Sequence, residues 1–158
     1  MGDDEPRLPP GTDLRRWVRL RRRLNAPPQR VFGAWADPEE LARWFPVQIE
    51  GGLAVGSRSV LAWPDRRVWW EVTRAEPDSR FAFRRPWLPD ESLVTAVQVS
   101  IGPAGYGTHI ELEDGPFPLD LPGGIDAWAE AIALWSDTLA MLRAHLDFSV
   151  DLRTGRQA

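Results

Sequence analysis

The apolar residues near the end of the chain recur at intervals of four and three. The members of this repeat, within residues 125–147, are Trp128, Ile132, Trp135, Leu139, Leu142 and Leu146. This spacing places them on one face of a helix, so the pattern predicts a long amphipathic helix with a continuous apolar stripe. Such a helix would be roughly 30 Å long, enough to cross a whole sheet. We expect Asp126 to cap its N-terminus, because aspartate accepts hydrogen bonds from free amide groups there.

Most of the preceding chain alternates between apolar and polar residues, which is the pattern of strands with one buried face. Turn signals rich in glycine, proline and aspartate separate these segments. The segments that we predict as strands are residues 14–24, 59–63, 67–75, 81–85, 93–101 and 106–113. Their short, regular spacing indicates an antiparallel meander. Residues 114–124 contain three prolines and three glycines, and we predict a loop there.

The first predicted strand is followed by two short helices. Pro27 or Pro28 can begin a helix, because the first helical turn does not need its N–H groups. Asp37 then caps a second helix, with Pro38 at its first position. The apolar residues at helical spacing are Val31, Phe32, Trp35, Ala36, Leu41, Trp44 and Phe45. This order of elements predicts an α+β helix-grip fold, in which a curved antiparallel sheet of about six or seven strands surrounds the long helix.

Charged side chains share one face of two predicted strands. In the first strand they are Arg19, Arg21 and Arg23. In the last strand they are His109, Glu111 and Glu113. The arginines could form an anion-binding stripe, and the second row could form an acid–base cluster or a metal site. Antiparallel sheets commonly keep one face in water, so we interpret both rows as solvated outer faces and expect no metal site.

Glu71 is the one candidate catalytic residue, and it is a weak one. It lies in a strand directly after two tryptophans, so its orientation decides its role. If Trp69 and Glu71 face inward, the carboxylate enters an aromatic pocket and could act in acid–base chemistry. If Trp70 and Val72 face inward, Glu71 lies at the surface. We favour the second orientation, because it places Val68, Trp70 and Val72 together on the buried face.

The composition fits one globular domain. The chain has 158 residues, of which 43% are hydrophobic and 27% charged, enough to bury a core. We expect residues 1–12 to form a disordered arm, residues 13–148 a single domain and residues 149–158 a polar tail. The net charge of −4 gives no reason to expect nucleic-acid binding. No apolar run reaches the roughly 18 residues of a membrane span. The lack of cysteine excludes disulfides and thiol catalysis and fits a cytoplasmic location.

Two segments resemble the START-like (SRPBCC) superfamily. The first is the run LNAPPQRVFGAW at residues 24–35, which resembles the opening motif of that superfamily. The second is the run DPEELARWF at residues 37–45, which resembles the branch named for the activator of the heat-shock-protein ATPase. The final helix also fits, and the resemblance covers about residues 14–147. It implies a cavity between the sheet and the long helix. Members of the superfamily include lipid carriers, polyketide cyclases and co-chaperone domains.

The resemblance and the nine tryptophans together suggest binding of a small hydrophobic or aromatic molecule. The residues that we expect to line the cavity are Trp35, Phe45, Trp63, Trp70, Phe83, Trp87, Val97, Trp128, Ile132 and Trp135. One alternative is a co-chaperone-like module that binds a chaperone or another protein. Another is a cyclase-type or hydrolase-type enzyme that uses an inward carboxylate such as Glu71. We expect no cofactor, and the chain could be a monomer or a homodimer.

Overall fold

The computed structural model describes residues 8–88 and 90–153, within which it contains three helices and seven strands. In chain order these are β1 (Arg15–Leu24), α1 (Pro28–Ala36), α2 (Pro38–Leu41), β2 (Gln48–Glu50), β3 (Arg58–Trp63), β4 (Arg66–Glu76), β5 (Arg80–Trp87), β6 (Leu93–Ala104), β7 (Gly107–Pro118) and α3 (Gly124–Phe148). Residues 1–7 and 154–158 of the expected arm and tail lie outside the described residues. None of the described helices is long and apolar enough to cross a membrane.

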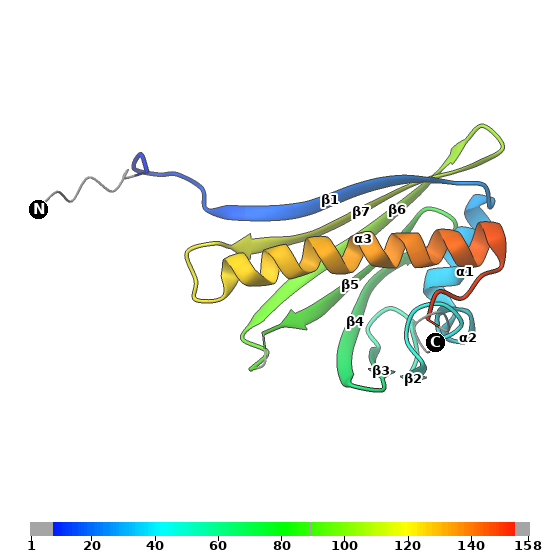
Figure 1. Ribbon diagram of the computed structural model, residues 1–158, viewed down its shortest axis with the longest axis horizontal. Helices are drawn as coiled ribbons and strands as arrows, with labels where there is room; N and C mark the ends of the chain where they lie inside the picture. Colours follow the sequence, from blue (N-terminus) through cyan, green and yellow to red (C-terminus); the bar gives the residue numbers. More distant parts are fainter. Residues whose placement is uncertain (1–7, 89, 154–158) are drawn as a thin grey trace, which may run out of the picture.

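The strands form one antiparallel sheet that curves around α3 (Figure 1). Their order is β1-β7-β6-β5-β4-β3-β2, so the first strand pairs with the last and the others follow as a meander. The helix α3 lies across the concave face of the sheet, and α1 and α2 lie near the C-terminal end of α3 (Figure 1). The predicted helix-grip fold is confirmed. The three-residue strand β2 was not predicted, because it is too short to produce a recognisable alternation.

The charged rows of β1 and β7 lie next to each other on the outer face of the sheet. Arg19 is paired with Glu113 and Arg21 with Glu111 in the register of the two strands. Their side chains form ion pairs of 3.2 and 2.9 Å, and His109 is exposed beside them. The interpretation of both rows as solvated faces is confirmed. Exposed pairs of this kind contribute about 0–1 kcal/mol each, so they mark the wet face of the sheet more than they stabilise it.

Glycines, not Asp126, form the N-terminus of α3. Gly123 precedes the helix with a φ of 80°, in the left-handed region that glycine adopts without strain. At Gly124 a Cβ atom would lie 1.9 Å from the carbonyl oxygen of Pro118. Asp126 lies in the first turn, and no side chain caps the helix. The predicted cap is therefore wrong, because the end of β7 passes too close to the start of α3 for any residue except glycine.

The buried face of α3 follows the second half of the predicted stripe and departs from it in the first half. The large residues of the stripe that are fully buried are Trp135, Leu139, Leu142 and Leu146. Ile132 is 37% exposed, and the smaller Ala127 and Ala131 face the sheet instead. These small side chains allow α3 to pack closely against β1 and β7. Ile132 lies about 100° around the helix from Ala131, so the prediction that it is buried is wrong.

β7 continues through the segment that was predicted as a loop. Asp114 pairs with residues of both neighbouring strands, and β7 ends only at Pro118. At Gly115 a Cβ atom would lie 2.4 Å from the ring of Trp17, so the glycine allows close packing here and does not mark a turn. The loop prediction for residues 114–118 is therefore wrong. Asp, Gly and Pro are typical turn residues, but pairing with two strands keeps them in the sheet.

Aromatic side chains fill the space between α3 and the sheet. The largest fully buried ones are Trp35, Trp44, Trp70, Trp135, Phe45, Phe81, Phe83 and Phe117. The rings of Trp70 and Phe83 stack with their centroids 3.7 Å apart, and the Trp35 and Trp44 rings meet edge to face at 5.1 Å. Contacts of this kind are worth roughly 0.5–1.5 kcal/mol beyond the buried area. The core is therefore largely a packed aromatic cluster.

Candidate functional site

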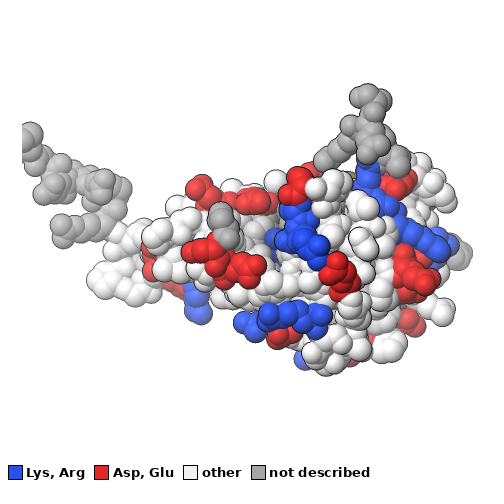
Figure 2. Space-filling model, turned by 90° about the horizontal axis from the view of Figure 1, so that it is seen from below, with Lys and Arg blue, Asp and Glu red and all other residues white. Residues whose placement is uncertain are grey.

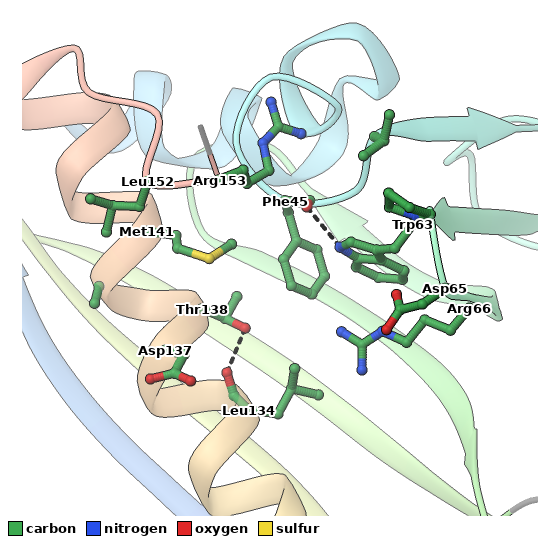
Figure 3. Close-up of a pocket in the computed structure, with 13 residues that line it drawn as sticks. Phe45, Trp63, Asp65, Arg66, Leu134, Asp137, Thr138, Met141, Leu152 and Arg153 are labelled. Atoms are coloured by element: carbon green, nitrogen blue, oxygen red, sulfur yellow. Dashed lines mark hydrogen bonds between the residues drawn. The ribbon is translucent and has the colours of Figure 1, made fainter. Parts of the chain in front are cut away.

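A cleft opens between α3 and the turn that joins β3 to β4 (Figure 3). Its volume is about 540 Å³, within the roughly 300–1,000 Å³ of small-molecule sites. The residues on the α3 side include Leu134, Thr138 and Met141. The residues on the opposite side include Phe45, Trp63 and Arg66. The cleft thus has mostly apolar walls that come from segments far apart in the sequence.

Phe45 and Trp63 form the rigid aromatic wall of the cleft. The Trp63 indole N–H donates a 3.0 Å hydrogen bond to the Phe45 carbonyl oxygen. Their rings meet edge to face with centroids 5.1 Å apart. The Phe45 side chain is also packed 6.3 Å from the Trp135 ring, which ties the wall to the core beneath α3. With its N–H satisfied, Trp63 presents only apolar surface to an incoming molecule.

Charged side chains border the cleft. Asp65 comes from the turn after β3, Arg66 is the first residue of β4, and Asp137 comes from α3 (Figure 3). Arg66 lies over the Trp63 ring, with its guanidinium carbon 4.5 Å from the ring centroid. Within the described residues, no hydrogen bond or ion pair engages the side chains of Asp65, Arg66 or Asp137. The cleft border therefore offers one cation and two carboxylates that a ligand could meet.

The segment after α3 closes one side of the cleft. Arg153 donates hydrogen bonds to the carbonyl oxygens of Ala42, Arg43 and Pro46 and pairs with Asp151 at 2.9 Å. These bonds hold residues 149–153 against the end of α2, and Leu152 lines the cleft beside Arg153. The first half of the expected polar tail thus forms part of the candidate site, whereas residues 154–158 lie outside the described part of the chain.

Among the residues expected to line a cavity, Phe45 and Trp63 line the cleft. Others are buried in the packed core and do not line it, namely Trp35, Trp70, Phe83, Trp87, Val97 and Trp135. Trp128 is partly buried, and its indole N–H donates to the Trp17 carbonyl oxygen at 3.3 Å. Ile132 is 37% exposed and does not line the cleft. The rest of the cleft lining was not predicted.

Glu71 lies on the outer face of the sheet, away from α3. Its carboxylate is 3.3 Å from Arg58 and 3.6 Å from Arg84, and its chain neighbour Trp70 is fully buried. The orientation favoured from the sequence is confirmed, and Glu71 is not the inward carboxylate that an enzyme of cyclase type would need. Within residues 8–88 and 90–153, no group of three His, Cys, Asp or Glu side chains could hold a metal ion.

Asp114 is the carboxylate that does face the interior. It is fully buried, and its Oδ2 atom accepts a 2.8 Å hydrogen bond from the Trp135 indole N–H. Its Oδ1 atom has no hydrogen-bond partner within the described residues. The Thr95 hydroxyl lies close by and accepts a 2.7 Å bond from Trp87. Burial raises the pKa of Asp114 to about 6, against the opposing effects of Thr95, Trp135 and Arg85.

Arg85 faces the same interior and is only 6% exposed. Its guanidinium carbon lies 3.8 Å from the centroid of the Trp87 ring and 5.7 Å from that of Trp135. Burial lowers the pKa of Arg85 to about 10, although the charge of Asp114 acts in the opposite direction. Both charged residues could have been found from the sequence, because Phe81, Phe83 and Arg85 alternate on one face. Ile110, Leu112 and Asp114 alternate in the same way.

The face seen from below in Figure 2 carries acidic and basic side chains in mixture, with uncharged surface between them. The described residues on this face form no continuous basic area of the kind that binds a nucleic-acid backbone.

Residues 25–147 match the model of the protein family described as Activator of Hsp90 ATPase homolog 1-like protein. The chain belongs to this family. The match covers β2 to β7, α1, α2 and α3 up to Asp147, whereas β1 lies before it. No curated protein sequence matches the chain.

Solved structures that are similar to the chain share the fold of the Activator of Hsp90 ATPase homolog 1-like family. Protein MLL2253 from Mesorhizobium loti is 24% identical, with a TM-score of 0.74 over 84% of this chain and 97% of that one. The Aha1 dimer from Colwellia psychrerythraea is 17% identical, with a TM-score of 0.74 over the same shares. CalU16 from Micromonospora echinospora is 23% identical, with a TM-score of 0.70 over 85% of this chain and 78% of that one.

Proposed function

We propose that this protein binds a small hydrophobic or aromatic molecule in the cleft between α3 and the β3–β4 turn. The observation that carries the proposal is the apolar wall made by Phe45, Trp63, Leu134 and Met141 around a volume of about 540 Å³. An aromatic ring placed there would contact the Trp63 face and the two aliphatic side chains of α3. The polar groups stand at the border, as they do in sites that bury an apolar body and orient it by a few polar contacts.

The expected affinity is moderate. Burial of about 300 Å² of apolar surface, counted over ligand and protein, would contribute about 7.5 kcal/mol at 25 cal/mol per Å². The loss of translational and rotational freedom on association reduces this by several kcal/mol. The dissociation constant of a naphthalene-sized molecule should therefore lie between the micromolar and millimolar ranges. Titrations at tens of micromolar protein are suited to such binding.

The test uses N-phenyl-1-naphthylamine, an uncharged aromatic molecule whose fluorescence rises in apolar surroundings. The variant Ala140→Trp places a large side chain in the cleft, because Ala140 lines it and is exposed. The matched control is Ala133→Trp, two helical turns away on the exposed surface of the same helix. We expect saturable binding by the unmodified protein, at least tenfold weaker binding by Ala140→Trp, and unchanged binding by Ala133→Trp. Equal binding by both variants would place the molecule elsewhere and contradict the proposal.

A second candidate function is interaction with a chaperone, the role that the family description names. Apolar side chains beside the cleft favour a protein contact, because Val47 and Leu152 are 59% and 43% exposed. The test is a pull-down with Hsp90 and a measurement of its ATPase rate, each with the protein and with a Val47→Asp, Leu152→Asp variant. Binding and stimulation that the double variant loses would support this function, and the absence of both would exclude it. Sedimentation of the same samples would distinguish a monomer from a homodimer.

A further inference from the structure

The interior beneath α3 holds a positive charge that the protein does not pair. Arg85 is 6% exposed, yet its only side-chain hydrogen bond within the described residues is a 3.4 Å contact with the Pro86 carbonyl oxygen. The carboxylates of Asp114 and Glu130 act on it electrostatically, but neither forms an ion pair with it within the described residues. Asp114 is held instead by the Trp135 indole N–H. Buried charges are normally paired, so we expect a bound group to supply a negative charge to this guanidinium.

The surroundings of Arg85 orient its guanidinium group for binding an anion. The Trp87 ring supports one face of the group at 3.8 Å, and the Trp135 ring lies at 5.7 Å. Aromatic support of this kind fixes the plane of an arginine side chain while leaving N–H groups on its edge free to donate. That edge matches two oxygens of a carboxylate or sulfonate, which accept two parallel hydrogen bonds from arginine. An uncharged group would leave the guanidinium without an ion-pair partner.

Arg85 does not line the cleft, but two of its neighbours connect it to the cleft. Arg66 lines the border and lies near enough for its charge to act on Arg85. Leu134 lines the wall and is adjacent in the chain to Trp135, whose ring flanks the Arg85 guanidinium. A molecule that enters between the β3–β4 turn and α3 therefore meets Arg66 at the border and lies against Leu134, whose chain neighbour Trp135 flanks Arg85. Neither arginine forms an ion pair with a carboxylate within the described residues, although the charges of Asp114 and Glu130 act on Arg85.

The two carboxylates at the border of the cleft do not reverse the preference of Arg85 for an anionic group. Asp65 and Asp137 are exposed, so water screens their charges. Arg85 is buried, where the interaction between two charges at a given distance is about four times stronger at an effective dielectric constant of 20 than in bulk water. The buried cation should therefore dominate the choice of the ligand's charged group, while the exposed carboxylates affect only the approach.

We propose that the molecule bound in the cleft is an aromatic or aliphatic anion whose acidic group, a carboxylate or sulfonate, binds to Arg85, with Arg66 contributing from the border. This inference rests on the proposed function and specifies the charge of the ligand. It predicts a preference for a ligand with an acidic group over an uncharged ligand of the same shape.

The test compares two fluorescent molecules with the same aromatic body. One is 8-anilinonaphthalene-1-sulfonate and the other is the uncharged N-phenyl-1-naphthylamine. We expect the unmodified protein to bind the sulfonate at least tenfold more tightly. The variant Arg85→Met should remove this preference and change the affinity for the uncharged molecule by less than twofold. The matched control is Arg84→Met, which removes the same charge from the adjacent residue on the outer face, where Arg84 meets Glu71. This control should keep the preference.

A measurement on the unmodified protein keeps the inference testable if Arg85→Met does not fold. The sulfonate should shift the indole N–H resonances of Trp87 and Trp135 in a ¹H–¹⁵N spectrum, with Trp87→Phe identifying the first signal. Equal affinity for both molecules, or a preference that survives in folded Arg85→Met, would overturn the inference and leave the proposed function intact. If neither molecule binds saturably, or Ala140→Trp changes nothing, the proposed function itself fails.

Discussion

The two faces of the sheet use the same charged residue types in opposite ways. Glu113 and Asp114 are neighbours in β7, and Arg84 and Arg85 are neighbours in β5, so one residue of each pair faces water and the other faces α3. On the outer face, Arg84 lies 3.6 Å from Glu71. On the inner face, burial raises the pKa of Asp114 to about 6 and lowers that of Arg85 to about 10.

The difference shows that the pKa of an ionisable side chain in this protein depends more on its access to water than on ion pairing. When an exposed ion pair forms, each side chain loses contacts with water and gains a contact with its partner. The net gain in free energy of folding is small. The inner residues lost their water and did not gain an ion pair with each other, so their charged forms are less favourable. Buried charged groups of this kind lower the stability of the fold. Their presence is explained if a bound ligand pairs with the charge or a proton neutralises it. The predictions below test this contrast between the two faces.

The largest expected effect is on stability when Asp114 is removed. Asp114→Ala removes the larger of the two carboxylate charges that act on the buried Arg85, leaving that of Glu130, and leaves the Trp135 N–H without an acceptor. The two side chains form no ion pair, but loss of a buried opposite charge together with a hydrogen-bond acceptor should cost about as much as loss of one partner of a buried charged pair, about 3–5 kcal/mol. We expect urea denaturation at pH 7 to show a loss of about 4 kcal/mol for Asp114→Ala and less than about 0.5 kcal/mol for the adjacent Glu113→Ala. Similar losses in both variants would contradict the contrast.

The next effect is a pH dependence from the same residue. The pKa of Asp114 is raised from 3.8 to about 6 on folding, so between these values the folded state binds a proton that the unfolded state has released. Stability is therefore greatest below pH 4 for this group and falls as the pH rises through about 6. Two pKa units correspond to about 3 kcal/mol. The free energy of unfolding of the unmodified protein, minus that of Asp114→Asn, should fall by about this amount between pH 4 and 7.

A difference that stays constant with pH would show that Asp114 titrates as it does in the unfolded chain. The control is Glu113→Gln, on the outer face of the same strand. It removes an exposed carboxylate and leaves the buried one in place, so this variant should keep the fall that Asp114 gives the unmodified protein between pH 4 and 7.

The fold could be predicted from the sequence because its determinants are local. The spacing of Trp135, Leu139 and Leu142 specifies the buried face of α3, and Asp37 accepts from the Glu39 amide at the start of α2 as expected. Prediction failed where distant segments override local preference. Asp114 and Gly115 belong to a turn by composition, and only their pairing with β1 and β6 places them in a strand.

The candidate site was less predictable than the fold. Phe45 and Trp63 were among the residues expected to line a cavity from the family resemblance and the many tryptophans. Leu134 and Met141 were not, because the gap between α3 and the β3–β4 turn depends on the distance at which the helix packs on the sheet. No local pattern encodes that distance. Arg85, in contrast, follows Phe81 and Phe83 at the next inward position of β5. A charged residue in this row of apolar residues could have been recognised in the sequence.

The smallest effect compares two indole N–H groups on α3. Trp135→Phe keeps most of the packing but removes the donor to Asp114, a buried bond of 2.8 Å. Trp128→Phe removes a partly buried donor whose bond to the Trp17 carbonyl oxygen is 3.3 Å. A buried acceptor that loses its donor costs about 1–3 kcal/mol, whereas water can replace a donor at a partly exposed acceptor.

We therefore expect Trp135→Phe to lower the free energy of unfolding at pH 7 by about 1.5 kcal/mol and Trp128→Phe by less than about 0.5 kcal/mol. Below pH 4 the loss in Trp135→Phe should shrink, since a protonated Asp114 is a weaker acceptor and its charge no longer depends on the indole. A loss that is the same at both pH values would mean that Trp135 acts through packing alone. The hydrogen bond from the Trp135 indole would then contribute nothing to the ionised Asp114, and the two faces of the sheet would not differ in this respect.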